Sequence, residues 1–349
     1  MNIVFLEGDM SRRGGTERMT AWLSAMLARR HRVFILSLRN QNGNLFFPID
    51  GAVSHTVLPA GSTFRKIREI HRFIRKNNIR TVINVDTGMG YIGILAARGT
   101  GARVITWEHA NFHNNWNSRL FPHLRRFAAK KSDAMVVLTE RDRENYTNRI
   151  RKCVPVTVIP NPAKPADTAY NTGAKIILSA GLLDKIKRFH LLVPIGQAVF
   201  GKHPDWQWHL CGDGPERNAL ETAVREAGLE KNIQFCGAVG HMEGKYAAAA
   251  MYVLTSETEG LPMVLLEAKA HRLPIVSFDI ETGPGDIVRD GVNGYLVQSG
   301  DTAAMADRIC TLIENENLRK QFSDSAVLDM EKFDEERIVE KWEKLIAGP

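Results

Sequence analysis

The sequence lacks both an apolar run long enough to cross a bilayer and a secretory signal. A membrane-spanning helix needs roughly 18 or more consecutive apolar residues. The longest candidate, residues 189–201, is shorter and contains Pro194. Near the N-terminus, Glu7 and Asp9 stand where a signal would need basic residues and then a long apolar segment. We therefore expect a cytoplasmic protein that does not span a membrane.

Cysteines are few and form no pattern typical of a metal site or a disulfide framework. No CxxC pair occurs, because the four cysteines are spread along the chain at positions 153, 211, 236 and 310. No DxD-like metal motif follows a predicted strand either. The sequence predicts reduced, buried thiols, no metal and no other cofactor.

The net charge of +7 is divided unevenly along the 349 residues. Residues 1–165 hold 27 Lys and Arg against 11 Asp and Glu, and the remainder holds 19 against 28. A basic half can face phosphates, nucleic acid or an anionic membrane surface, and charge alone does not choose among them. A chain of this length with ordinary globular composition favours two domains.

Short apolar runs alternate with longer helix-like segments, which is typical of parallel sheets built from βα units. The first half has strand candidates at residues 3–6, 33–37, 81–85, 104–107 and 134–138. The second half has them at residues 175–180, 207–211, 233–236, 251–254 and 275–278. Each half therefore predicts one Rossmann-like α/β domain.

The domain boundary is expected within residues 158–175, a segment rich in proline and small polar residues. The prediction is an N-terminal domain over residues 1–165 and a C-terminal domain over 166–330. Residues 331–349 are expected to form a helix with one apolar face that packs back on a domain, the N-terminal domain being the favoured candidate.

The strongest candidate site follows the predicted strand 251–254. Pro262 fits the first turn of a helix whose free N–H groups and dipole favour ligand oxygens. Glu259 precedes this helix and Glu267 lies inside it, roughly 8 Å further along the axis. An isolated pair of this kind is usually a helix-start acid and a solvated side chain. Glu267 lies in the apolar run VLLEAKA, however, where a charge needs partners.

The segment EGLPMVLLE, residues 259–267, resembles the acidic signature of glycosyltransferase family 4, which comprises retaining enzymes. Three other segments resemble that family in the expected order: SAGLLDKIKRFHLLV (179–193), CGDGPER (211–217) and TGPGDIVRDGVNGYLV (282–297). The resemblance covers residues 175–300 well and the first half loosely. It implies the GT-B fold, in which two Rossmann-like domains face a central cleft.

The resemblance also implies roles for residues of the second half. Glu267 would hold the ribose hydroxyls of a nucleotide-sugar donor, and Lys187 would neutralise its diphosphate. The transferred sugar would lie against Glu259 and the backbone of Gly260, Leu261, Pro262 and Met263. Leu182 stands where the family usually has Arg, so Lys185 or Arg188 is the candidate replacement.

Two matches in the first half complete the predicted site. In SRRGGTERM, residues 11–19, Gly14 and Gly15 would let the backbone approach the donor, with Thr16 as the helix cap. His109 follows the predicted strand 104–107 and matches a family histidine beside the donor sugar. A tight turn and a structural histidine are the alternatives for these positions.

The predicted reaction moves a sugar from a nucleotide donor to a glycan or lipid-linked acceptor, with retention of configuration. Uracil is the expected base and guanine the alternative. The resemblance places the reaction in cell-envelope polysaccharide or lipopolysaccharide synthesis. Charge developing on the diphosphate would be stabilised by Lys187 and the helix amides, with Glu259 and His109 as the other catalytic candidates.

Two basic segments, residues 64–77 and 119–131, favour contact with an anionic membrane. We therefore expect a peripheral position at the inner face of the plasma membrane. Amphipathic helices that only cover the core are the alternative. Two other functions compete with the transferase: a nucleotide-sugar epimerase of the same fold, and a nucleic-acid-binding protein, which lacks support from any stacking aromatic set.

Overall fold

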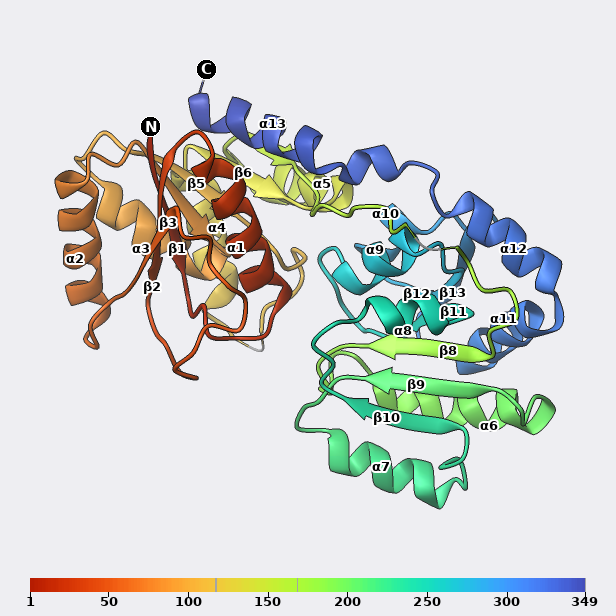
Figure 1. Cartoon of the computed structure of the whole chain (residues 1–349). Helices are drawn as coiled ribbons and strands as arrows, with labels where there is room; N and C mark the ends of the chain where they lie inside the picture. Colours follow the sequence, from red (N-terminus) through yellow and green to blue (C-terminus); the bar gives the residue numbers. More distant parts are fainter. Residues whose placement is uncertain (117, 168, 349) are drawn as a thin grey trace. The chain divides into compact units, whose positions relative to one another are not determined.

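The computed structural model describes residues 1–116, 118–167 and 169–348, which form two compact units (Figure 1). Unit 1 comprises residues 1–161 together with the segment from Glu335 onward, and unit 2 comprises Pro162–Asp334. The division falls inside the segment expected as a linker, four residues before the predicted boundary at 165. The C-terminal segment belongs to unit 1 although unit 2 precedes it in the chain.

Unit 1 is built on a parallel sheet of seven strands in the order β3-β2-β1-β4-β5-β6-β7. The central strands are apolar and buried along nearly their whole length because helices cover both faces of the sheet. The strands are β1 (Asn2–Glu7), β2 (Arg32–Ser37), β3 (Val53–Val57), β4 (Thr81–Val85), β5 (Arg103–Trp107), β6 (Ala134–Val137) and β7 (Val156–Val158).

Five helices connect these strands, and α3 packs between α2 and α4. Their bounds are α1 (Gly15–Ala28), α2 (Thr63–Lys76), α3 (Thr87–Ala97), α4 (Phe121–Lys131) and α5 (Glu140–Arg149). The strand order reverses at β1. Strands β2 and β3 lie on one side of β1, and β4 to β7 lie on the other side. Ligands of open parallel sheets bind at the carboxyl ends of strands at such a point.

The C-terminal helix α13 (Glu335–Ala347) packs on unit 1 and contacts α1 (Figure 1). The indole ring of Trp342 is buried 5.0 Å from that of Trp107 on β5, and Trp22 Nε1 donates a 3.0 Å hydrogen bond to Glu335. The helix begins four residues later than expected, because residues 330–333 form the separate 3-10 turn η2 (Met330–Phe333) within unit 2.

Unit 2 contains a parallel sheet of six strands in the order β10-β9-β8-β11-β12-β13. Its strands are β8 (Ile176–Ala180), β9 (Gln207–Cys211), β10 (Ile233–Gly237), β11 (Met251–Leu254), β12 (Ile275–Asp279) and β13 (Gly294–Gln298). Its helices are η1 (Phe189–Leu191), α6 (Leu192–Lys202), α7 (Arg217–Glu226), α8 (Glu243–Ala248), α9 (Met263–Ala270), α10 (Pro284–Ile287), α11 (Thr302–Glu314) and α12 (Glu316–Ser325). The order reverses at β8, which is flanked by β9 and β11.

Three strands were not predicted from the sequence: β3, β7 and β13. All three form edges of their sheets, and β3 and β7 are short or partly polar, so neither shows a long apolar run. Across the described parts of the chain, the helices all fall short of the length and apolar character that a membrane span requires. All four cysteines have free thiols.

Candidate functional site

In unit 2, the loops that follow β8 and β11 are bonded together at the carboxyl edge of the sheet. Glu257 N–H donates to the carbonyl oxygen of Ile186 at 2.8 Å, and Thr255 Oγ1 donates to that of Lys187 at 2.8 Å. Lys187 N–H in turn donates to Asp184 Oδ1 at 3.0 Å. These bonds fix the backbone on which the predicted ligand groups are carried.

Lys187 and Glu259 meet at this edge as a short ion pair. Lys187 Nζ lies 2.6 Å from Glu259 Oε1, and the side chains are 21% and 12% exposed. The lysine is therefore half-buried against a carboxylate rather than an isolated surface residue. A pair so enclosed keeps its Coulomb attraction better than a surface pair, yet leaves both groups open to a third, polar partner.

Helix α9 begins beside this ion pair. Pro262 has extended backbone angles and is the N-cap, so the prediction that it occupies the first helical turn is wrong by one residue. The first backbone bond of the helix runs from Leu265 N–H to Pro262, which leaves the amides of Met263 and Val264 ahead of it. Amides in this position, together with the helix dipole, favour oxygen atoms of a ligand.

The segment after β12 holds the residues before α9 in place. Thr282 Oγ1 donates to the carbonyl oxygen of Glu259 at 2.6 Å. Gly283 has φ +98°, and a Cβ there would lie 2.5 Å from Pro262 Cδ and 3.0 Å from the carbonyl oxygen of Gly260. This close approach requires glycine at position 283. The segments TGPG and EGLP are therefore in direct contact.

Glu267 is half-buried inside α9 and accepts a 2.6 Å hydrogen bond from the Tyr246 hydroxyl of α8. The Tyr246 ring is buried and stacks on His271 with centroids 4.9 Å apart. The sequence indicated that Glu267 needs a partner but not which one, because Tyr246 lies in a different helix. The bond orients the carboxylate without neutralising it.

The phosphate-loop candidate after β8 lies very close to the loop after β9. A Cβ on Gly212, where φ is +147°, would overlap the carbonyl oxygen of Gly181, and one on Gly214 would come within 2.5 Å of that of Leu183. Leu183 N–H donates to Asp213 at 3.0 Å across the same contact. The segments GLL and CGDG therefore form one backbone unit.

The position of the missing family arginine is open to solvent, since Leu182 is 58% exposed. Arg188 was one candidate replacement. Its guanidinium pairs with Glu257 at 3.0 Å, and its Nη1 lies 3.4 Å from Ser299 Oγ. The Arg188 side chain is thus bound to Glu257 and Ser299.

His109 belongs to unit 1 and is the second residue after β5. Its ring lies against Trp107 with centroids 4.2 Å apart. Burial lowers the pKa of His109 to about 3, so the imidazole is neutral at physiological pH. Its Nε2 is buried, and within the described residues it has no hydrogen-bond partner. A neutral ring nitrogen of this kind can accept or donate one further hydrogen bond.

Gly14 is the N-cap of α1, and Gly15 is its first residue. The prediction of Thr16 as the cap is therefore wrong. A Cβ on Gly14 would overlap Glu17 Oε2, so the Glu17 carboxylate occupies the space that the missing side chain leaves. Arg12 Nε lies 3.4 Å from Glu17 Oε1. Burial raises the pKa of Glu17, and Arg12 opposes the shift.

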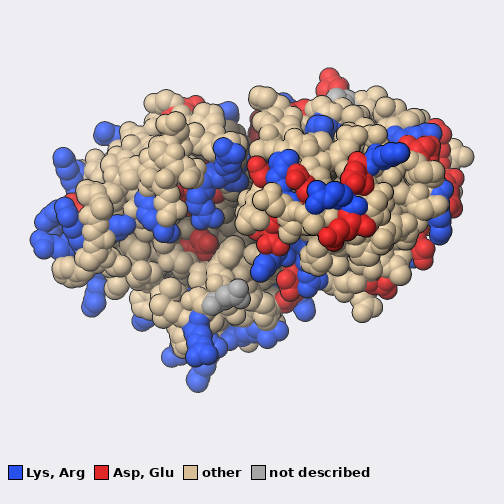
Figure 2. All heavy atoms as spheres, turned by 90° about the horizontal axis from the view of Figure 1, so that it is seen from below, with Lys and Arg blue, Asp and Glu red and all other residues tan. Residues whose placement is uncertain are grey.

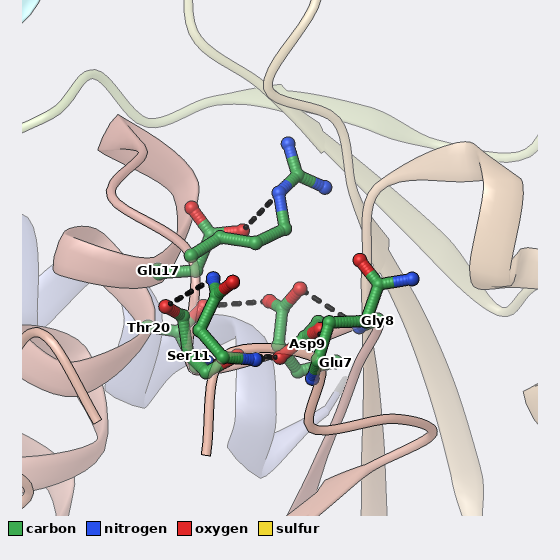
Figure 3. Close-up of polar contacts among 9 residues, drawn as sticks. Glu7, Gly8, Asp9, Ser11, Glu17 and Thr20 are labelled. Atoms are coloured by element: carbon green, nitrogen blue, oxygen red, sulfur yellow. Dashed lines mark hydrogen bonds and ion pairs between the residues drawn. The ribbon is translucent and has the colours of Figure 1, made fainter. Parts of the chain in front are cut away.

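Glu7 and Asp9, which were not predicted as site residues, lie in the same region (Figure 3). Glu7 accepts bonds from Gly8 N–H at 2.8 Å and Thr20 Oγ1 at 3.2 Å, and burial raises its pKa to about 8. Asp9 accepts bonds from Ser11 and from Gln41 N–H. The sequence could have predicted these two residues as part of a site, because they are polar and stand at the end of a predicted strand. Such residues gather at the carboxyl edge of a parallel sheet.

The predicted site residues are thus divided between the two units. Unit 2 brings together Lys187, Arg188, residues 259–263 and Glu267 at the carboxyl ends of β8 and β11. Unit 1 carries Gly14, Gly15 and His109 at the carboxyl edge of its own sheet. Among the described residues, no three His, Cys, Asp or Glu side chains gather in a way that could hold a metal ion.

Known proteins resemble this chain over nearly its whole length. Residues 14–162 match the family described as "Glycosyl transferase 4-like domain", and residues 161–328 match "Glycosyl transferases group 1". An uncharacterized glycosyltransferase of Haemophilus influenzae is 29% identical over 345 residues, which cover 95% of this chain and 96% of that protein.

Two further relatives carry more specific names. A Campylobacter jejuni enzyme, GalNAc-alpha-(1->4)-GalNAc-alpha-(1->3)-diNAcBac-PP-undecaprenol alpha-1,4-N-acetyl-D-galactosaminyltransferase, is 26% identical, and the match covers 99% of this chain and 98% of that protein. The crystal structure of Anabaena HepE in complex with UDP superposes with a TM-score of 0.85 at 16% identity, covering 100% of both chains.

The order of the two families along the chain is the order of its two parallel-sheet units, and together they match residues 14–328. This chain therefore belongs to the glycosyltransferases of group 1 with a 4-like N-terminal domain, and it has the GT-B fold.

Proposed function

We propose that this enzyme transfers a sugar from a UDP-sugar to a lipid-linked glycan acceptor, with retention of configuration, in cell-envelope polysaccharide or lipopolysaccharide synthesis. The observation that carries the proposal is the 2.6 Å ion pair of Lys187 and Glu259 at the first turn of α9. The three kinds of group at this edge each suit one feature of a nucleotide-sugar. The cation suits the diphosphate, the carboxylate suits the sugar hydroxyls, and the N–H groups at the helix start suit oxygen atoms that accept hydrogen bonds.

In the proposed complex, Lys187 binds the diphosphate, and the amides at Met263 and Val264 bind oxygens of the donor. Glu259 is released from part of its bond to Lys187 and accepts hydrogen bonds from sugar hydroxyls. Glu267, oriented by Tyr246, accepts hydrogen bonds from the ribose. Gly14, Gly15 and His109 of unit 1 are proposed to complete the donor site.

The proposed chemistry is mainly electrostatic. When the bond from the anomeric carbon to the phosphate oxygen breaks, the sugar becomes oxocarbenium-like and the diphosphate gains negative charge. Lys187 and the helix amides stabilise that charge where it develops. Neutral His109 can accept a hydrogen bond from the sugar without adding a positive charge beside the cationic centre.

The acceptor class rests on the Campylobacter relative, whose name includes a diphosphate-linked undecaprenol, and the base rests on the UDP complex of HepE. The reaction is proposed to need no added divalent metal. Loss of all turnover in chelator, restored by Mg²⁺ or Mn²⁺, would contradict that part.

Thermal stabilisation by UDP, GDP, CDP and ADP tests the donor assignment, because a ligand that binds only the folded state raises the melting temperature. We expect UDP to raise the melting temperature, and we expect Glu267→Ala to lower the affinity for UDP at least tenfold. The control is Glu226→Ala, an exposed carboxylate of α7 in the same unit. Unchanged UDP affinity in the Glu267 variant would remove the proposed ribose contact and with it this site.

A further inference from the structure

The ring of His109 is placed by packing. Its Nε2 is buried, and the described residues offer this atom no hydrogen-bond partner. The backbone N–H of His109 donates to Glu108 Oε1 at 3.1 Å, which fixes the main chain but not the side-chain torsions. The ring lies against Trp107, with centroids 4.2 Å apart and planes at 49°. The orientation of the imidazole therefore depends on where the Trp107 ring lies.

Trp107 is held in the same way. Its side chain is buried at the end of β5, and its Nε1 makes no hydrogen bond within the described part of the chain. A buried indole N–H usually has an acceptor, so contacts of the ring itself place this side chain. On α13, Trp342 packs edge to face against it, with centroids 5.0 Å apart and planes at 72°. The three rings form a continuous row from Trp342 through Trp107 to His109.

Helix α13 fixes the outer end of this row. Trp22 Nε1 donates to Glu335 Oε1 at 3.0 Å at the first residue of the helix, and His31 Nε2 lies 2.7 Å from Glu343 Oε2 near its end. Trp342 lies between these two contacts and is 1% exposed. The helix therefore cannot slide or turn on unit 1 without breaking one of these bonds.

We propose that Trp342 is a positioning residue for His109, acting through the ring of Trp107. Trp342 lies outside residues 14–328, which the two families match. The effect on sugar transfer rests on the proposed function. The effect on the His109 ring does not, because it can be measured without any donor.

The row of rings also keeps water from the imidazole. Burial lowers the pKa of His109 to about 3. Two charged groups are next to these rings in the sequence: Glu108, which accepts the bond from the His109 N–H, and Glu343, which is paired with His31. Removing the Trp342 ring leaves both groups in place and lets Trp107 move. Water then reaches the imidazole, and its protonated form becomes more favourable.

Trp342→Leu tests this effect, because leucine keeps an apolar side chain without a ring. The titration of His109 is followed by NMR between pH 4 and pH 8 on protein with ¹⁵N-labelled histidine, and its signals are identified by their absence in His109→Gln. We expect the unaltered protein to keep this ring neutral over the range. In Trp342→Leu we expect its affinity for protons to rise at least a hundredfold, so that it titrates above about pH 5.

Trp342→Phe retains a smaller ring, and its titration should lie between the other two. Ile70→Ala is the control for lost stability, since Ile70 is a buried residue of α2 in an apolar cluster that includes neither Trp107 nor Trp342. A His109 that stays neutral in Trp342→Leu, or that titrates equally in Ile70→Ala, would overturn the proposal. If Trp342→Leu does not fold, Trp342→Phe decides. Half-protonation of His109 by about pH 4 then supports the proposal, and a ring still neutral at that pH overturns it.

Turnover tests the consequence for transfer. With a UDP-sugar donor, we expect kcat for UDP release to fall at least tenfold in Trp342→Leu. KM for the donor should change less, because the groups proposed to bind the donor in unit 2 are unaltered. Trp342→Phe should recover part of the lost kcat, and Ile70→Ala should keep it.

The two readouts separate this proposal from the proposed function. Failure of the unaltered protein to release UDP from any UDP-sugar would contradict the proposed function, while the titration of His109 would still decide whether Trp342 positions the ring. An unchanged kcat in a Trp342→Leu protein with an altered titration would overturn the role of this contact in transfer.

Discussion

Gly212 shows how a single residue determines the geometry of the candidate donor site. Its φ of +147° lies in a region that residues with a Cβ rarely adopt, and a side chain would overlap the carbonyl oxygen of Gly181. The loops after β8 and β9 can approach each other only because this residue is glycine. The motif CGDG therefore has a structural reason independent of any ligand.

Gly212→Ala should destabilise unit 2 by more than about 2 kcal/mol, since backbone strain and steric overlap add. Gly228→Ala is the matched control, because φ is +69° but no atom lies within 4 Å of the place that its new Cβ would take. We expect about 1 kcal/mol for the control. Urea unfolding measures both, and equal losses would show that the contact with Gly181 relaxes freely.

Lys269 is a buried lysine on α9, two residues after Glu267. It is 2% exposed, and its Nζ lies 3.3 Å from the carbonyl oxygen of Ile287. Burial lowers its pKa to about 8. The unfolded chain then binds more protons than the folded one between pH 8 and 10.5, so stability contributed by this group increases across that range.

Lys269→Met should remove this increase and should not destabilise the protein at pH 7, because a buried charge is replaced by an apolar chain of similar length. The control is Lys231→Met, an exposed lysine of the same unit. Stability measured by urea unfolding at pH 7 and pH 10 decides the matter. A fall of more than about 2 kcal/mol at pH 7 would mean that the bond to Ile287 outweighs the burial of charge.

Helix α13 illustrates what an element gains from packing. Its apolar residues recur on one face, which predicted a helix, and the buried members are Ile338, Trp342 and Ile346. Periodicity does not identify the unit on which that face packs, because it reports only which residues share a face of the helix. The contact of Trp342 with Trp107, and the bond between Trp22 and Glu335, assign it to unit 1.

Trp342→Ala should therefore destabilise unit 1 by about 3–5 kcal/mol, the usual effect of emptying a large aromatic site. Lys341→Ala, an exposed neighbour on the same helix, should change stability by less than about 0.5 kcal/mol. Unfolding followed by tryptophan fluorescence would resolve the difference. Similar midpoints for the two variants would show that α13 adds little to unit 1.

At the scale of the whole molecule, the division of charge between the halves of the sequence follows the division into units. Lys and Arg side chains project from the surface of unit 1 (Figure 2), and helix α2 carries several of them. The Phe64 side chain at the start of α2 is 70% exposed. An exposed aromatic ring on a helix that carries several arginines suits an anionic membrane interface.

We expect this protein to sediment with vesicles that contain anionic lipid and not with neutral vesicles. Replacing Arg65, Arg68 and Arg75 by Gln should weaken binding at least tenfold, since each basic residue near the surface contributes about 1 kcal/mol. The control replaces three exposed cations of unit 2: Lys202, Arg225 and Lys231. Equal binding to both lipids, or an equal loss in both triple variants, would contradict docking by α2.

The sequence by itself determined the α/β class, most central strands and the residues of the EGLPMVLLE segment. These predictions follow from patterns of neighbouring residues. The patterns are apolar runs of strand length, a proline at the start of a helix, and acidic residues close to that strand and helix. It also determined the need for a partner at Glu267, because a charge in an apolar run is unfavourable without one.

Only the tertiary structure decided which groups meet. Tyr246 reaches Glu267 from another helix, Lys187 pairs with a residue 72 positions away, and Trp342 packs against Trp107. Spacing in the chain does not report such contacts, since they depend on strand order and on how helices cover the sheet. The protonation states follow from burial, which no local pattern of residues specifies.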